Sequence, residues 1–247
     1  MRLATLLLLC AFSGAAIATD IRVLSATAVA PGLAKVADQF RRETGNRVRI
    51  SLGTTPQLER RLSVDDTIDI LIASPGLMND QLRRNKVEPE KHVYIGRVGI
   101  GVAVRAGSFE PDIGTLERFK QVVLTADAIV YTDAGSGLYL DKLLDLLGIG
   151  DQLKTKTFRY ASATQVLEHL AGGKGVEIGF ATIPEIRLAE DKGVKLVGPL
   201  PDQIQSATTY SAAVVSDAPE AEIAEKFVQY LDTPAARALF AAAGFDN

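Results

Sequence analysis

The strongest constraint on the fold is a repeated succession of an apolar run, a small polar turn and an amphipathic helix. Residues 128–131 form an apolar, strand-like run, residues 135–137 form a Gly–Ser–Gly turn, and leucines recur at helical spacing through residues 140–148. Residues 68–73 form a near-continuous apolar run, which is typical of a strand buried on both faces of a parallel sheet. This alternation predicts the α/β fold class with doubly wound sheets.

Four of the predicted turns are rich in Ser, Thr, Gly and Ala, and they cover residues 25–28, 53–55, 135–137 and 161–164. In open α/β sheets, ligands bind outside the carboxyl ends of the strands, where such turns lead into helices. A helix N-terminus presents unpaired N–H groups and a positive dipole end, so it attracts anions. The same residues could instead only cap their helices. If two such units face each other, the turns line one cleft that suits a small anion.

The first 18 residues have the pattern of a cleavable signal peptide. Arg2 gives a positive start, residues 3–12 an apolar segment, and residues 16–18 an Ala–Ile–Ala cleavage site. The apolar segment is too short to span a membrane, so we expect a soluble periplasmic protein. The single cysteine, Cys10, lies in this segment, so the mature chain has neither a disulfide nor a thiolate ligand.

Several classes of function lack their sequence signature. There is no basic run and no stripe of arginine and aromatic residues, so nucleic acid is not expected as a partner. His92 and His169 lie far apart, with no carboxylates at metal-ligand spacing, so no metal site is expected. The chain has no nucleophile elbow, phosphate loop or dinucleotide fingerprint, so we assign no catalytic residue and no cofactor. Asp69 is expected to brace a turn, because a buried carboxylate needs partners.

Five segments occur in the order and spacing of a known family. They are residues 23–28, 52–55, 69–74, 136–139 and 177–180. With them, the chain resembles the periplasmic molybdate-binding proteins of ABC transporters, within the type II periplasmic binding-protein superfamily. The resemblance implies two doubly wound α/β domains with a hinge and an inter-domain cleft. It also implies that hydroxyls and backbone amides capture an anion as the cleft closes.

The domain boundaries are placed at a crossing strand. Residues 93–104 form a long β-rich run with several glycines, which suits a strand that passes between domains. The resemblance implies that the C-terminal segment returns to the first domain. We therefore predict domain I as residues 19–97 with 207–247, and domain II as residues 98–206, after the signal peptide of residues 1–18.

The chain departs from the family pattern at positions that bear on the ligand. Ala28 stands where the first turn of the family usually has a ligand serine, and Thr55 replaces a serine in the second turn. Thr182 replaces a late tyrosine, and Arg97 replaces an asparagine in the crossing strand. A guanidinium pairs with a carboxylate in a two-pronged way, so Arg97 favours a carboxylate over a compact metal oxyanion. Its alternative is a solvent-facing arginine on an exposed strand.

The candidate ligand-binding residues are mostly hydroxyl or glycine residues of these turns, together with the arginine of the crossing strand. They are Ser25, Thr27, Thr54, Thr55, Ser74, Arg97, Ser136, Gly137, Tyr139, Ser162 and Thr182. Tyr139 is included because it lies on the first turn of its helix, from which its hydroxyl could donate into the cleft; the alternative is packing against the neighbouring helix.

Two functions from different classes are open at this point. The first is an extracytoplasmic solute-binding protein that captures a molybdate-like oxyanion or a small carboxylate and passes it, as a monomer, to the membrane permease of an ABC transporter. The alternative is an isomerase of an unsaturated polycarboxylate, similar to aconitate isomerase, with Arg97 as an anion clamp and an unassigned base. A sensor-type membrane partner would use the same cleft.

Overall fold

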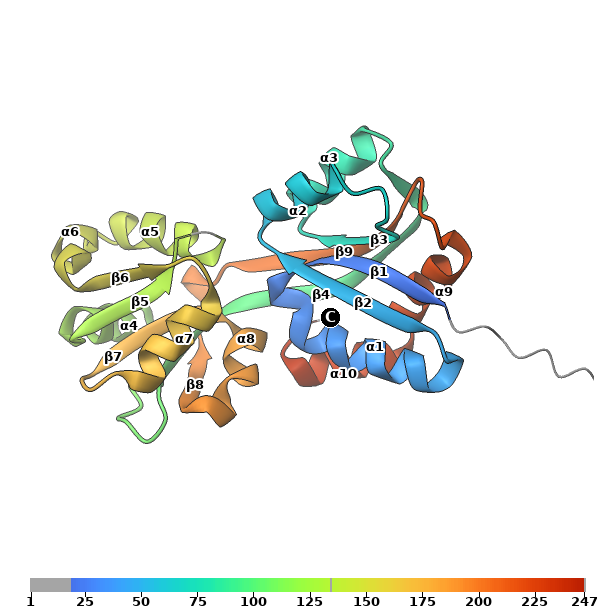
Figure 1. The fold of residues 1–247 in the computed structure, drawn as a ribbon. Helices are drawn as coiled ribbons and strands as arrows, with labels where there is room; N and C mark the ends of the chain where they lie inside the picture. Colours follow the sequence, from blue (N-terminus) through green and yellow to red (C-terminus); the bar gives the residue numbers. More distant parts are fainter. Residues whose placement is uncertain (1–18, 134, 247) are drawn as a thin grey trace, which may run out of the picture.

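The computed structural model describes residues 19–133 and 135–246, which form two α/β lobes side by side (Figure 1). The segment predicted as a signal peptide, residues 1–18, lies outside the described residues. Within the described ranges, no helix is long and apolar enough to cross a membrane. The α/β fold class predicted from the sequence is confirmed.

The first lobe is built on a sheet with the strand order β2-β1-β3-β9-β4. Its strands are β1 (Asp20–Ala26), β2 (Arg47–Gly53), β3 (Ile70–Ala73), β4 (Val87–Arg105) and β9 (Ala207–Val215). β1 runs parallel to β2 and β3, whereas β9 is antiparallel to both of its neighbours. One face is covered by α1 (Ala30–Thr44), α9 (Ala221–Leu231) and α10 (Pro234–Ala243), and the other by α2 (Thr55–Leu62) and α3 (Pro75–Arg83).

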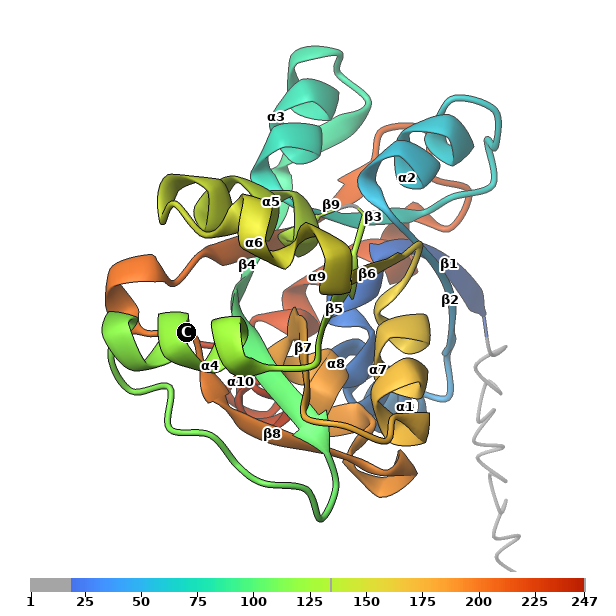
Figure 2. The same ribbon diagram turned by 90° about the vertical axis from the view of Figure 1, so that its left-hand side faces the viewer.

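The second lobe faces the viewer in Figure 2, and its sheet continues from β4 through β7 and β5 to β6, while β8 also pairs with β4. Its other strands are β5 (Ala128–Thr132), β6 (Thr157–Tyr160), β7 (Glu177–Thr182) and β8 (Val194–Pro199). On one face lie α4 (Leu116–Thr125), α5 (Ser136–Leu146) and α6 (Gly150–Leu153), and on the other α7 (Ala163–Gly172) and α8 (Ile183–Leu188). Short 3-10 turns are η1 (Thr27–Val29), η2 (Lys154–Lys156), η3 (Glu190–Lys192) and η4 (Asp202–Ile204).

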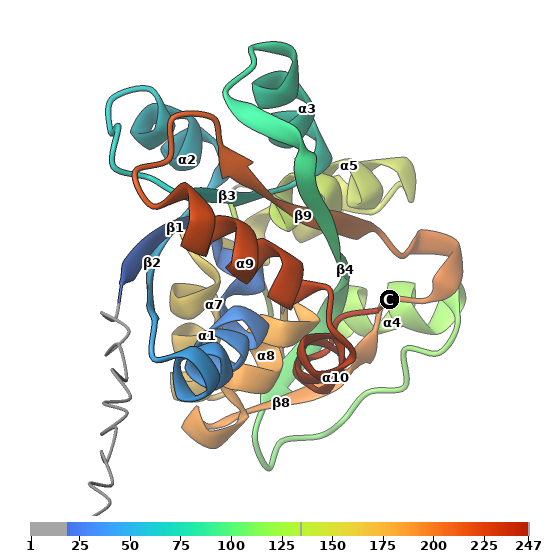
Figure 3. The ribbon, with the colours of Figure 1, turned by 90° about the vertical axis from the view of Figure 1, so that its right-hand side faces the viewer.

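Strands β4 and β9 connect the two lobes. β4 has 19 residues and pairs with β9 in the first lobe and with β7 and β8 in the second. The predicted crossing strand, residues 93–104, therefore exists and is longer than expected. After β9 the chain returns to the first lobe, where α9 and α10 cover the sheet (Figure 3) and Asp246 pairs with Arg97. The residue boundaries of the two domains stay a prediction.

Helix α1 shows how local sequence sets the packing of the first lobe. Leu33, Val36 and Phe40 recur at helical spacing and are buried against the sheet, as their periodicity predicts. The helix ends at Gly45, which takes the left-handed conformation with φ 79°. At its start, a Cβ atom on Gly32 would lie 2.3 Å from the ring of Phe240, so glycine is needed for α1 to pack against α10.

Asp69 braces the first lobe, as expected for a carboxylate inside an apolar run. It is 1% exposed, and its Oδ2 accepts a hydrogen bond from the backbone N of Arg22 at 2.7 Å. Its Oδ1 accepts one from the backbone N of Glu220 at 2.8 Å. The carboxylate thus ties β1 to the start of α9, two segments far apart in the sequence.

We expect Asp69→Ala to lower the free energy of unfolding by about 3 kcal/mol, because it leaves two backbone N–H groups without their charged acceptor. Urea unfolding followed by circular dichroism measures the change. Asp66→Ala is the control, since Asp66 is exposed. A loss for Asp69→Ala no larger than that of the control would contradict the bracing role.

Candidate ligand-binding site between the lobes

Parallel strands bring the turns of each lobe to one edge of its sheet. β1 pairs in parallel with β2 and β3, and β5 pairs in parallel with β6 and β7. Four candidate residues follow such strands as helix N-caps: Thr54 of α2, Ser74 of α3, Ser162 of α7 and Thr182 of α8. Ser136 is the first residue of α5. Each lobe therefore presents several helix N-termini at one edge of its sheet.

The candidate hydroxyls of the first lobe differ in whether the protein already uses them. Ser25 is buried, and its Oγ donates to the carbonyl oxygen of Ala26 at 3.1 Å. Thr54 forms a capping box with Gln57, whose Oε1 accepts the Thr54 N–H at 2.9 Å. The hydroxyls without a hydrogen bond among the described residues are those of Thr27, Thr55 and Ser74. These three can donate to a ligand without breaking an internal bond.

In the second lobe, the Gly–Ser–Gly turn keeps its backbone close to the preceding strand. A Cβ atom on Gly137 would lie 1.7 Å from the carbonyl oxygen of Thr132, so no other residue fits there. The Ser136 hydroxyl makes no hydrogen bond within the described part of the chain. The Tyr139 hydroxyl donates to the carbonyl oxygen of Ile204 at 2.8 Å. Tyr139 is therefore engaged inside its own lobe.

The other two candidates of the second lobe act as side-chain caps. The Oγ of Ser162 accepts a hydrogen bond from the backbone N of Gln165 at 3.4 Å. The N–H and hydroxyl of Thr182 donate to Oε2 of Glu185 at 3.2 and 2.5 Å. This pair closes a capping box at the start of α8.

Arg97 lies on β4, the strand shared by both lobes. Its backbone exchanges hydrogen bonds with Asp246, with N···O distances of 2.7 and 2.9 Å. Its side chain is exposed and forms no ion pair among the described residues. The guanidinium is therefore free to meet an anion that reaches the crossing strands.

The lobes meet where α8 contacts η1 and α1, and a pocket of about 300 Å³ lies at this junction. Thr27 is the candidate residue that lines it, and Thr164 comes from the predicted turn at residues 161–164. The other polar lining residues are Glu168, Glu185 and Lys192. Alanine, proline, leucine and valine side chains form the remaining walls. The pocket thus combines hydroxyls and charges with an apolar surface.

Sequence reasoning missed Glu185. Burial raises the pKa of its carboxyl group, while the hydrogen bonds from Thr182 act in the opposite direction. Tyr210 on β9 is near enough to be affected by this carboxylate, and burial together with the charge of Glu185 raises the pKa of Tyr210 to about 12. The Thr–x–x–Glu pattern at residues 182–185 is the sequence signal that could have identified the residue.

Metal ligands do not gather in the part of the chain that the structure describes. None of its His, Cys, Asp and Glu residues form a group of three or more that could hold an ion. His169 contacts Tyr160 through Nδ1 at 2.7 Å and Glu177 through Nε2 at 3.3 Å, so it is held inside the second lobe.

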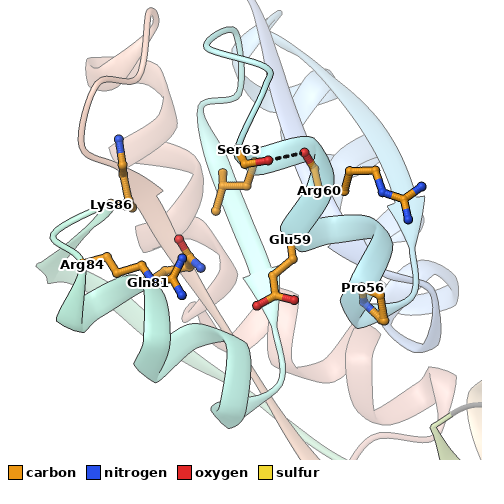
Figure 4. Close-up of a pocket in the computed structure, with 8 residues that line it drawn as sticks. Pro56, Glu59, Arg60, Ser63, Gln81, Arg84 and Lys86 are labelled. Carbon is orange, nitrogen blue, oxygen red and sulfur yellow. Dashed lines mark hydrogen bonds between the residues drawn. The ribbon is translucent and has the colours of Figure 1, made fainter.

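A second pocket, of about 380 Å³, lies between α2 and α3 (Figure 4). Arg60, Arg84, Lys86 and Glu59 are among the residues that line it. None of the eleven candidate residues belongs to it. The pocket is formed by the first lobe alone, so lobe closure would not enclose a ligand there.

The architecture defines a class of protein. Two α/β lobes joined by two crossing strands, with helix N-termini at the strand ends and a pocket at the junction, are the fold of the type II periplasmic binding proteins. The chain belongs to the family of bacterial extracellular solute-binding proteins, whose family model matches residues 21–246. Solute-binding proteins of ABC transporters bind a small ligand and deliver it to a membrane permease.

The chain is similar to proteins of two kinds. It is 30% identical over 218 residues to an aconitate isomerase of a Pseudomonas species, and the alignment covers 86% of this chain and 82% of that protein. It is 25% identical over 243 residues to the molybdate-binding protein ModA of Escherichia coli K12, and the alignment covers 95% of this chain and 93% of ModA. The solved structure of the periplasmic molybdate-binding protein of Azotobacter vinelandii aligns with a TM-score of 0.76 at 21% identity. The alignment covers 92% of this chain and 99% of that one. The predicted resemblance and fold are confirmed.

We expect Glu185→Gln to be more stable than the wild type at pH 8 and to differ little at pH 5. Because the folded protein raises the pKa of Glu185, the fold favours the protonated carboxyl, and this contribution is lost as pH rises through the raised pKa. Glutamine keeps the charge-free state and can serve in the capping box. Thermal unfolding at both pH values measures the difference.

Glu190→Gln is the matched control, because Glu190 is exposed and also accepts a backbone N–H, from Leu196. Two outcomes would contradict a raised pKa of Glu185: an equal change in unfolding temperature in both variants, or a wild type that is more stable than Glu185→Gln at pH 8.

Proposed function

We propose that this chain is a periplasmic solute-binding protein of an ABC-type transporter that captures a small organic anion between its lobes. The observation that carries the proposal is the set of helix N-termini at the strand ends of both lobes, with hydroxyls that have no partner among the described residues. These hydroxyls belong to Thr27, Thr55, Ser74 and Ser136. Family membership supports the capture and delivery role.

Two further features favour an organic anion over a compact metal oxyanion. The junction pocket has mostly apolar walls, which a carbon skeleton can cover and a metal oxyanion cannot. The unpaired guanidinium of Arg97 suits two-pronged contact with a carboxylate. Where the family offers a ligand serine, Ala28 is buried and has no hydroxyl. The ligand class proposed is therefore a small carboxylic acid in its ionised form.

Capture proceeds by closure of the lobes about β4 and β9. Closure brings N–H and O–H donors from both lobes to the anion and removes water from it. A hydrogen bond to a charged acceptor contributes about 1.5–3 kcal/mol, so a few donors suffice for micromolar affinity. The protein acts as a monomer, needs no cofactor and hands the ligand to the permease.

Isothermal titration calorimetry against molybdate, tungstate, sulfate, and di- and tricarboxylates tests this proposal. We expect binding of at least one carboxylate, and we expect Ser136→Ala to bind it about 10- to 100-fold more weakly through the lost charged hydrogen bond. Ser63→Ala is the control, since Ser63 caps the far end of α2 and donates to the carbonyl oxygen of Arg60. If none of these anions gives a heat of binding, the proposal is wrong.

A second candidate function is isomerisation of an unsaturated polycarboxylate, and the 30% identity to an aconitate isomerase over 86% of the chain favours it. Allylic proton transfer needs an anion clamp and a base, and Arg97 offers the clamp. Incubation with cis- or trans-aconitate, followed by chromatography for the other isomer, tests this candidate.

If the chain is an isomerase, Arg97→Ala should abolish most turnover, because the clamp positions the substrate. Arg47→Ala, at another exposed arginine with no ion pair among the described residues, should keep it. Tight aconitate binding without turnover in the wild type would exclude the isomerase and support solute capture.

A further inference from the structure

The carboxyl group of Glu185 is anchored on one side and open on the other. Its Oε2 accepts both hydrogen bonds from Thr182, so the orientation of the carboxyl group is fixed. Its Oε1 makes no hydrogen bond to any described residue, and Glu185 lines the pocket at the lobe junction. One acidic oxygen is thus available to a molecule that occupies this pocket.

Among the residues that the structure describes, no cation forms an ion pair with this carboxylate. Tyr210 on β9 is within range of its charge, Glu168 lines the same pocket from α7, and Lys192 lines it from η3 without forming an ion pair with Glu185. The other charged side chains on α8 and on the elements next to it form no ion pair with Glu185 among the described residues. They include the half-buried Arg105 and the exposed or otherwise paired Lys35, Arg97, Glu177, Arg187, Glu190, Lys195 and Arg237. An anion in this pocket would therefore meet a negative group at short range.

We propose that Glu185 contacts the bound anion through a shared proton, so that occupation of the junction pocket is accompanied by uptake of one proton from solvent. The proton lies between Oε1 and an oxygen of the ligand, and no covalent bond other than O–H changes. Without the proton, two negative groups within hydrogen-bond distance would repel each other strongly in a partly desolvated site. This proposal rests on the proposed function, because it requires that an anion binds at the junction.

The proposal also makes Glu185 a residue that determines specificity. An anion of a weak acid shares a proton readily, whereas an anion of a strong acid accepts it poorly. Among anions of similar size, carboxylates should therefore bind in preference to sulfate. Replacement of the carboxyl by an amide should reduce this preference, since the amide can donate N–H to either kind of anion.

The test is calorimetric titration of the whole mature protein with trans-aconitate and with molybdate, at several pH values between 6 and 9. Each titration is repeated in two buffers that differ in ionisation enthalpy, which gives the number of protons taken up. For the wild type we expect uptake approaching one proton per anion bound. The affinity should fall by up to about tenfold per pH unit once the pH exceeds the pKa that Glu185 has in the unliganded protein. For E185Q we expect binding that no longer depends on buffer or on this pH range.

E190Q is the matched control and should behave as the wild type, because Glu190 does not line the pocket. Circular dichroism verifies that E185Q folds, and the amide can keep the capping box. A buffer-independent heat of binding in the wild type at every pH would overturn the proposal while leaving anion capture intact. Proton uptake that persists in E185Q would do the same. If neither anion nor any other carboxylate binds the wild type, the proposed function fails and this proposal fails with it.

Discussion

The backbone pairing of β4 with β9 is the interaction on which the rest of the structure depends. Both strands are part of the first-lobe sheet, and β4 continues into the sheet of the second lobe. Their register shifts between Tyr94 and Gly96, and the pairing then continues from Gly96 to Gly99, toward the second lobe. If the lobes close on a ligand as proposed, this pair of strands is where the motion would be absorbed, because both strands run from one lobe to the other.

The direction of the strands decides where hydrogen-bond donors gather. Because the inner strands of each lobe are parallel, their carboxyl ends and the helices that follow share one edge. Some of the hydroxyls there are already used: Thr54 and Thr182 close capping boxes, and Ser162 caps α7. The hydroxyls of Ser74 and Ser136 form no hydrogen bond among the described residues. The protein thus separates residues that hold the helices from residues that can serve a ligand.

The junction pocket gives this chain its individual chemistry. Its relatives include an aconitate isomerase and a molybdate-binding protein, so family membership fixes the fold but leaves the ligand open. The ligand class depends on local residues instead. Apolar walls and the carboxyl of Glu185, which forms no ion pair among the described residues, distinguish the pocket from a cage made only of amides and hydroxyls.

The sequence by itself determined the strand–turn–helix order, the buried strand β3, the face of α1 and the bracing role of Asp69, because each depends on local periodicity or on the cost of burying a charge. Only the tertiary structure decided which hydroxyls form hydrogen bonds inside the protein, as the hydrogen bond from the Tyr139 hydroxyl to the carbonyl oxygen of Ile204 shows. It also placed Glu185 beside Tyr210 and against the first lobe, which are 25 or more residues away in the chain. Such contacts join distant segments, and no local pattern encodes them.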